Sequence, residues 1–276
     1  MGRLTIMALP LIRRLFPHRF GLAMLTRFPL LGRWIDRALF HEDHLLILPR
    51  DGTVRTIETD IRAEQEDLVL PSSVVEELVR RSEHRFLMDF CICRTSNLCQ
   101  DYPRGLGCLF LGEAATRIDH RLGRRVSVEE ALDHLRRCRE EGLVHLVGRN
   151  KLDSVWLGAR PRERLMTVCS CCPCCCLWRM IPHLREDLGR RVRGMPGLEV
   201  RLDGSICTGC GTCLDSCFLG AISLVEGRAS IDRGLCRGCG RCADVCPQGA
   251  IGMALRPGSA EELVEELDSL ADIHKE

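Results

Sequence analysis

Nineteen cysteines among 276 residues are the side chains of this sequence best suited to bind metal. Eight of them form two copies of the run C-x2-C-x2-C-x3-C, and each cysteine of the second copy follows its counterpart by 29 residues. The first copy comprises Cys207, Cys210, Cys213 and Cys217, and the second comprises Cys236, Cys239, Cys242 and Cys246. A repeat at one fixed offset indicates duplication of a structural unit. Thiolates in such numbers are ligands for iron–sulfur clusters or zinc.

The spacing within each copy favours iron–sulfur clusters over zinc. Three cysteines of such a run surround one face of a cuboidal cluster, while the fourth cysteine reaches the other cluster. A zinc ribbon instead needs four ligands arranged in two pairs. The repeat therefore predicts two 4Fe-4S clusters. The first is held by Cys207, Cys210, Cys213 and Cys246, and the second by Cys236, Cys239, Cys242 and Cys217.

Residues 201–257, which carry this repeat, resemble the two-cluster bacterial-type ferredoxins. The resemblance implies a ferredoxin-like dicluster domain that transfers electrons at low potential. The sequence departs from the ferredoxin pattern at Phe218, which stands where a proline usually follows the fourth cysteine, whereas Pro247 keeps this position in the second copy. We expect this departure to change the packing and the solvent access of the cluster bound by Cys217.

Ten further cysteines form two upstream groups. The first group predicts a third cluster at Cys91, Cys93, Cys99 and Cys108. The second has six cysteines in eight residues, Cys169, Cys171, Cys172, Cys174, Cys175 and Cys176. Because neighbouring side chains point in different directions, we expect four of these six to hold a fourth cluster. Zinc, or one larger cluster shared by both groups, is the alternative.

The upstream motifs also carry a resemblance of their own. Cys-Ile-Cys-Arg at 91–94, Gly107-Cys108 and Cys-Cys-Pro-Cys-Cys-Cys at 171–176, followed by the repeat, are similar to a family of uncharacterised multi-cluster 4Fe-4S proteins of anaerobic archaea and bacteria. The resemblance covers most of the chain. It supports cluster binding but supplies no established reaction. The cysteine count predicts at least two 4Fe-4S clusters and as many as four.

The pattern of the rest of the chain predicts an α+β fold, with a cysteine-rich α+β domain followed by the dicluster domain. Ser127 with Glu130 predicts a capped helix, and Leu143 to Val147 predicts a strand after it. A helix followed by strand, turn and strand is similar to a winged helix. We divide the chain into four parts: a basic amphipathic segment (1–40), the cysteine-rich domain (41–200), the ferredoxin domain (201–257) and an acidic helix (258–276).

Charge is balanced over the whole chain but not along it. With 39 Lys and Arg against 38 Asp and Glu, the net charge of +1 makes nucleic acid an unexpected partner. Residues 1–40 combine seven arginines and one acid with apolar side chains. This pattern predicts docking to a membrane surface or an enzyme complex, and the alternative is a helical hairpin packed on the body with its arginines in water.

These observations predict an iron–sulfur electron carrier or electron-transfer subunit rather than a stand-alone enzyme. The sequence lacks G-x-G-x-x-G and G-x-x-x-x-G-K-[ST], so we expect no nucleotide cofactor and electrons from a redox protein donor to a protein acceptor. An oxygen-sensitive protein of the anaerobic cytoplasm, peripheral to the membrane if residues 1–40 dock there, fits this role. One alternative is a reductase with a catalytic cluster or thiol pair in Cys169–Cys176. Another is a redox-sensing regulator that uses the winged helix.

Overall fold

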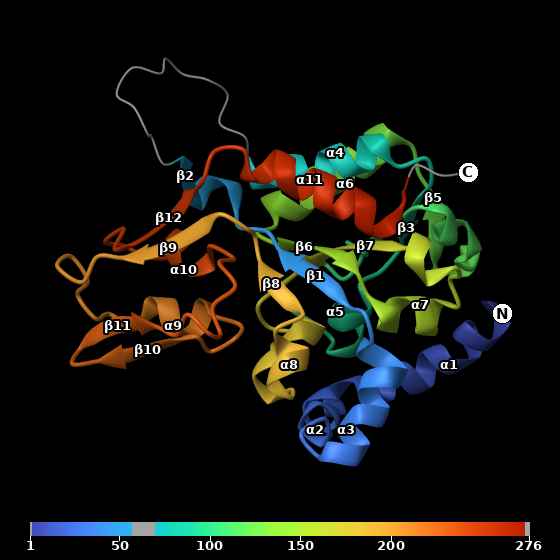
Figure 1. Ribbon diagram of the computed structural model, residues 1–276, viewed down its shortest axis with the longest axis horizontal. Helices are drawn as coiled ribbons and strands as arrows, with labels where there is room; N and C mark the ends of the chain where they lie inside the picture. Colours follow the sequence, from blue (N-terminus) through green and yellow to red (C-terminus); the bar gives the residue numbers. More distant parts are fainter. Residues whose placement is uncertain (1, 57–69, 274–276) are drawn as a thin grey trace.

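A seven-stranded sheet forms the centre of the computed structural model, which describes residues 2–56 and 70–273 (Figure 1). The strand order is β5-β3-β4-β7-β6-β1-β8, and neighbouring strands are antiparallel except for β1 and β8. The strands are β1 (His44–Ile47), β3 (Arg85–Met88), β4 (Leu109–Leu111), β5 (Gly123–Arg125), β6 (Val144–Arg149), β7 (Met166–Cys171) and β8 (Val192–Gly194). The predicted strand at Leu143 to Val147 is confirmed as β6, and the α+β fold class is confirmed as well.

Alternation along the strands separates two hydrophobic cores, one on each face of this sheet. In β7, Met166 and Val168 pack into one core, whereas Cys169 and Cys171 lie against the other. Phe110 of β4 also faces the second side, whereas its neighbours Leu109 and Leu111 belong to the first. Successive side chains of a strand point to opposite faces. The sheet therefore directs the strand cysteines to one face only.

Three helices cover the face without cysteines: α4 (Pro71–Arg81), α6 (Val128–Glu140) and α11 (Ser259–Ala271) (Figure 1). The predicted capping box of α6 is present, because the Ser127 hydroxyl accepts from the Glu130 amide while the Glu130 carboxylate accepts from the Ser127 amide. Leu263 and Leu267 of the acidic C-terminal helix α11 are fully buried. Helix α11, which follows the dicluster region in the chain, thus completes the core of the upstream domain.

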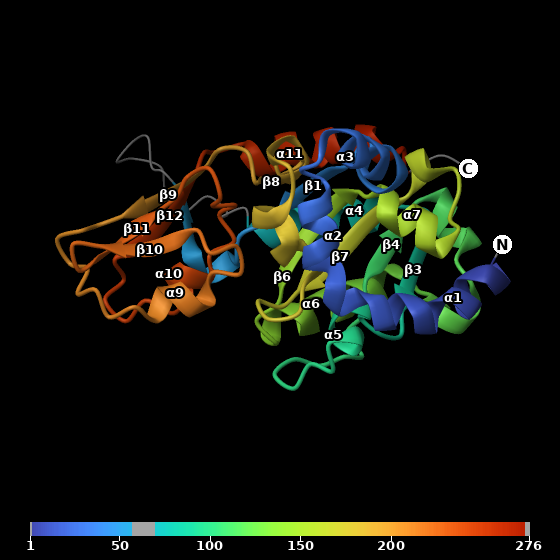
Figure 2. The ribbon, with the colours of Figure 1, turned by 90° about the horizontal axis from the view of Figure 1, so that it is seen from below.

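The opposite face is covered by the N-terminal segment and by short helices (Figure 2). These helices are α1 (Gly2–Leu15), α2 (Arg19–Leu25), α3 (Pro29–Ile35), α5 (Ile92–Ser96), α7 (Lys151–Leu157) and α8 (Glu186–Gly189). Residues 2–40 form several helical turns that pack on the body through Ala23, Ile35 and Phe40. Among the described helices, none is both long enough and apolar enough to cross a membrane.

The dicluster region lies beside the large sheet and is built from two small sheets (Figure 1). One contains β2 (Val54–Thr56), β12 (Ile251–Leu255) and β9 (Leu198–Leu202), so a strand from the upstream part completes it. The other pairs β10 (Ile222–Val225) with β11 (Arg228–Ile231), and the short helices α9 (Thr212–Ser216) and α10 (Arg241–Asp244) follow the cysteine loops. The proposed boundaries at 40, 200 and 257 stay a prediction.

The structure does not form the winged helix suggested by the sequence. After α6, β6 pairs with β7 and β1 in the middle of the large sheet, and α7 lies between β6 and β7 in the chain. A wing needs a hairpin that projects from the domain, whereas β6 is buried along most of its length. The structural basis for a DNA-reading regulator is therefore removed.

Candidate iron–sulfur and metal sites

The eight cysteines of the repeat lie around two separate cavities. Cys246 lines one cavity together with Cys207, Cys210 and Cys213, although it comes from the second copy of the repeat. The other cavity is lined by Cys217 of the first copy together with Cys236, Cys239 and Cys242. We call these the Cys246 set and the Cys217 set. The exchange of the fourth cysteine between copies has the arrangement expected for two cuboidal clusters.

Backbone amides point at sulfur atoms in both sets. Ala250 N donates to Cys246 Sγ at 3.3 Å, and Ala221 N donates to Cys217 Sγ at 3.2 Å. Such hydrogen bonds stabilise the negative charge that a thiolate ligand carries. The loop before Cys210 depends on Gly209, whose φ is +66° and where a Cβ would lie 1.9 Å from the Gly227 carbonyl oxygen. The cavities and their amides therefore fit two thiolate-bound clusters.

The two sets differ in their access to solvent. Cys210 is exposed, and hydrogen bonds from Thr212 lower the pKa of its thiol. In the Cys217 set, burial raises the pKa of Cys239 to about 11 and that of Cys242 to about 12. The Cys246 set thus faces the outside, while the Cys217 set faces the body of the protein.

Six upstream cysteines form a ring on the cysteine-bearing face of the large sheet. Cys108 Sγ and Cys169 Sγ lie 3.4 Å apart, and further thiol contacts join Cys108 to Cys91, Cys91 to Cys93, Cys169 to Cys171 and Cys171 to Cys176. No contact between the thiols of Cys93 and Cys176, the two ends of this series, is seen, but the charge of Cys176 influences Cys93. We call this set the six-cysteine ring: Cys91, Cys93, Cys108, Cys169, Cys171 and Cys176.

The other four upstream cysteines form a compact four-cysteine group. The sulfur atoms of Cys99, Cys172, Cys174 and Cys175 all lie within 4.8 Å of one another. Cys99 Sγ is 3.6 Å from Cys174 Sγ, and the Cys175 amide donates to Cys172 Sγ at 3.3 Å. Three members come from the turn after β7, and Cys99 follows α5.

This spatial grouping differs from the predicted one, in which Cys91, Cys93, Cys99 and Cys108 share one cluster and four of Cys169–Cys176 hold another. Which cysteines are cluster ligands stays a prediction. Each of the two upstream sets takes cysteines from both segments of the chain. Cys171 ends β7 and faces the ring, whereas the next residue, Cys172, faces the four-cysteine group. The physical reason is the opposite direction of adjacent side chains, together with the β4 and β7 pairing that brings Cys108 beside Cys169.

Arg94 lies between the two upstream sets and is fully buried. Its guanidinium donates to the carbonyl oxygens of Pro103 and Ser170, each at 2.8 Å, and to that of Leu106. Burial alone would lower its pKa, but the nearby thiolates of Cys91, Cys172 and Cys108 raise it overall. A buried charge needs a compensating one. Among the described residues Arg94 pairs with no carboxylate, and the negative charge that faces it comes from the neighbouring cysteine thiolates.

The pKa values of neighbouring ring thiols shift in opposite directions. Hydrogen bonds from Cys108 and Cys93 hold the pKa of Cys91 well below its usual range. In contrast, the hydrogen bond with Cys91 and burial raise the pKa of Cys93, and the hydrogen bond with Cys171 and burial raise that of Cys176. Six thiolates this close together repel one another unless cations lie between them. The donor set therefore suits a metal centre that accepts several thiolates.

The dicluster region meets the ring in an apolar interface. Arg241, buried on α10, donates to the carbonyl oxygens of Cys171 at 2.6 Å and of Gly142 at 3.1 Å. A small apolar cavity there is lined by Phe218, Trp178 and Arg241 together with Cys171, Cys172 and Cys176. Phe218 thus occupies the interface between the Cys217 set and the ring, which gives a structural role to the residue that replaces the usual proline.

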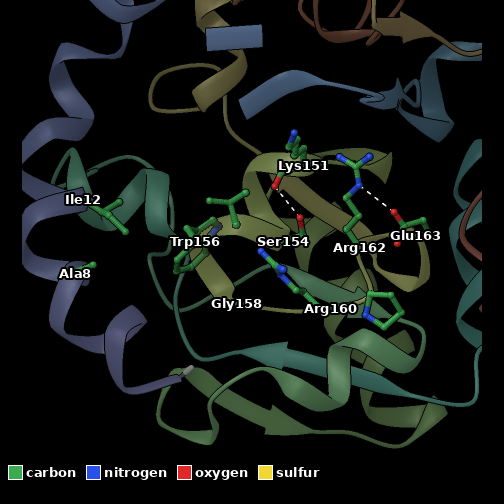
Figure 3. A pocket seen from close by; sticks show the side chains of 11 residues that line it. Ala8, Ile12, Lys151, Ser154, Trp156, Gly158, Arg160, Arg162 and Glu163 are labelled. Atoms are coloured by element: carbon green, nitrogen blue, oxygen red, sulfur yellow. Dashed lines mark hydrogen bonds and ion pairs between the residues drawn. The ribbon is translucent and has the colours of Figure 1, made fainter. Parts of the chain in front are cut away.

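A further pocket lies elsewhere, between α1 and α7 (Figure 3). Ala8 and Ile12 line one side, and Trp156, Arg160 and Arg162 line the other. Neither the six-cysteine ring nor the four-cysteine group contributes to its wall. A small molecule bound there would not meet a thiol.

Comparison with known proteins identifies one region of the chain. Residues 206–250 match the family of 4Fe-4S dicluster domains. The C-terminal region is therefore an iron–sulfur domain that binds two 4Fe-4S clusters, as the repeat predicts. No curated protein matches the chain.

Proposed function

We propose that this protein is an electron carrier that relays low-potential electrons between redox protein partners in anaerobic metabolism. In this proposal the six-cysteine ring holds a further iron–sulfur centre, which exchanges electrons with the dicluster region. Such centres supply one-electron steps, and the chain positions and insulates them. We expect the protein to act in the cytoplasm and to be sensitive to oxygen.

The contact of Arg241 and Phe218 with the ring carries the proposal. The Cys217 set lies next to this contact, while the Cys246 set is the one with an exposed cysteine. This order favours a path from an outside partner through the Cys246 set and the Cys217 set to the ring. A reductase would need room for a substrate beside the ring, but Trp178 and Phe218 enclose the small apolar cavity there. That enclosure favours a carrier.

Iron and acid-labile sulfide, counted on anaerobically purified protein, test the proposal. We expect more than the about eight irons that two 4Fe-4S clusters supply. Cys91→Ser and Cys171→Ser should each remove the surplus iron and leave about eight irons, because both residues belong to the ring only. A wild-type count of about eight irons would overturn the relay. Turnover of a small molecule by the reduced protein would instead favour a reductase.

Arg241 is expected to tune the cluster of the Cys217 set, because its cation lies close to Cys239. Removing this cation in Arg241→Leu should shift that cluster's midpoint potential to more negative values, by on the order of 50 mV. A redox titration followed by EPR measures the shift. Arg201→Leu, which removes an exposed arginine on β9 bonded to Glu199, is the matched control and should leave the potential unchanged.

For the docking partner of the N-terminal segment, we propose an anionic membrane surface. On and beside α3, the apolar side chains of Phe28, Leu30 and Trp34 are 60%, 82% and 68% exposed. The exposed arginines Arg27 and Arg33 lie among them. Helices that expose both bulky apolar side chains and arginines bind at the interface of anionic bilayers. Arginines alone would fit a solvated helical hairpin, but the exposed apolar side chains do not.

Sedimentation with lipid vesicles tests this docking. The protein should sediment with vesicles that contain phosphatidylglycerol and remain in solution with phosphatidylcholine alone. Trp34→Asp should weaken binding about tenfold or more. It replaces an apolar side chain that would be buried in the bilayer with a carboxylate, whose negative charge is repelled by the anionic lipid. Val225→Asp, at an exposed apolar position on β10, is the control. Equal binding of both variants would contradict a membrane partner and point to a protein complex.

A further inference from the structure

We propose that the four-cysteine group, Cys99, Cys172, Cys174 and Cys175, binds a single zinc ion rather than a fourth iron–sulfur cluster. Such a site would be structural and redox-inert, because Zn²⁺ does not change oxidation state. The proposal is independent of the electron relay: the ring and the dicluster region could carry electrons with or without it.

The separation of the sulfur atoms carries this inference. All four lie within 4.8 Å of one another, and one pair lies 3.6 Å apart. Four thiolates at about 2.3 Å from one tetrahedral zinc ion lie about 3.8 Å from each other. A cubane places four irons and four sulfides between its thiolates, so those sulfurs must stand farther apart. The four-cysteine group is too compact for a cubane.

The dicluster region of the same chain provides an internal comparison. Its two cysteine sets each surround a cavity, and no three of their sulfur atoms lie within 4.8 Å of one another. In the described residues, the six-cysteine ring has a closer single pair, Cys108 Sγ and Cys169 Sγ at 3.4 Å, but only the four-cysteine group has three or more sulfur atoms that all lie within 4.8 Å of one another. The two dicluster sets therefore line cavities, whereas the four-cysteine group closes around a space for a single ion.

The local chain geometry also fits zinc. Cys172 and Cys175 form a C-x2-C pair, which is a common spacing of structural zinc ligands. The Cys175 amide donates to Cys172 Sγ at 3.3 Å, and hydrogen bonds of this kind orient the ligands of a metal site. Four thiolates and one Zn²⁺ leave a net negative charge, and the buried Arg94 guanidinium interacts with Cys172 to offset it. Tetrahedral all-thiolate donor sets select zinc or iron.

A zinc ion here would fix the ring from one side. Cys172 and Cys175 stand directly beside the ring residues Cys171 and Cys176 in the sequence. Cys99, by contrast, belongs to a loop whose other end leads to Cys108. Zinc would therefore tie the loop after α5 to the turn after β7, and both segments carry ring ligands. The site acts as a clamp for the neighbouring metal centre.

Metal analysis of full-length protein, produced with ample iron and purified without oxygen, tests the proposal. Wild type should contain about one zinc per chain, and Cys99→Ser and Cys174→Ser should each lose most of it while keeping the eight irons of the dicluster region. Cys138→Ser is the matched control, because Cys138 is fully buried in the same apolar cluster as the group, while its thiol contacts His134 and is not one of the four sulfur atoms. It should retain the zinc.

Cobalt substitution gives a second readout that needs no variant to fold. Protein produced with Co²⁺ should show the intense charge-transfer and d–d absorption of tetrahedral cobalt thiolate while it still contains the dicluster iron. Absence of both zinc and this absorption would overturn the proposal. So would a loss of about four irons in Cys99→Ser, which would identify a cubane, or zinc that persists in both serine variants.

Discussion

Arg94→Leu is expected to empty the six-cysteine ring and to lower the free energy of unfolding by about 3–5 kcal/mol. The guanidinium is fully buried, donates to three carbonyl oxygens and pairs with no carboxylate among the described residues. Its removal leaves the negative charge of the metal-bound thiolates uncompensated and three carbonyls without a donor. Breaking a buried charge pair by removing one partner typically costs this much.

Iron content and thermal unfolding under anaerobic conditions measure both effects. Arg94→Lys should retain part of the ring's iron, because it keeps the charge but cannot donate to all three carbonyls at once. Arg136→Leu is the control, since Arg136 is exposed and its ion pairs with Asp133 and Glu140 contribute little. If Arg94→Leu kept its ring iron and its melting temperature, the buried cation would have no role in holding a centre.

The second large effect concerns the exchange of the fourth cysteine between the two repeats. Cys246→Ser should remove the same cluster as Cys210→Ser, although the two residues belong to different copies. Each variant should lose about four of the eight dicluster irons. The spin coupling between the two reduced clusters should also disappear, because only one cluster remains.

Double variants test directly which cysteines share a cluster. Combining Cys210→Ser with Cys246→Ser should cost no more iron than either change alone. Combining Cys210→Ser with Cys217→Ser should remove both clusters, about eight irons in total, because these residues line different cavities. The opposite pattern, in which Cys210 and Cys217 act on one cluster, would show that each copy of the repeat binds its own cluster.

Features that depend on neighbouring residues in the chain could be predicted from the sequence. The capping box at Ser127 needs only residues three apart, and the structure confirms it. Capping-box spacing by itself is not sufficient, because Ser73 and Glu76 of α4 have the same spacing. There the helix begins two residues earlier, at Pro71, and the Ser73 hydroxyl donates to the Leu70 carbonyl. Proline is favoured in the first turn of a helix, so α4 begins at Pro71 and not after Ser73.

The number and type of the cysteines determined that this protein binds metal, and the repeat with its fixed spacing determined a dicluster iron–sulfur domain. Tertiary structure alone decided how the other cysteines are shared. The pairing of β4 with β7 brings Cys108 beside Cys169, and the loop after α5 carries Cys99 away from Cys91 and Cys93. Sequence distance could not reveal this, because a metal site selects sulfur atoms by their positions in space and strand neighbours point to opposite sides.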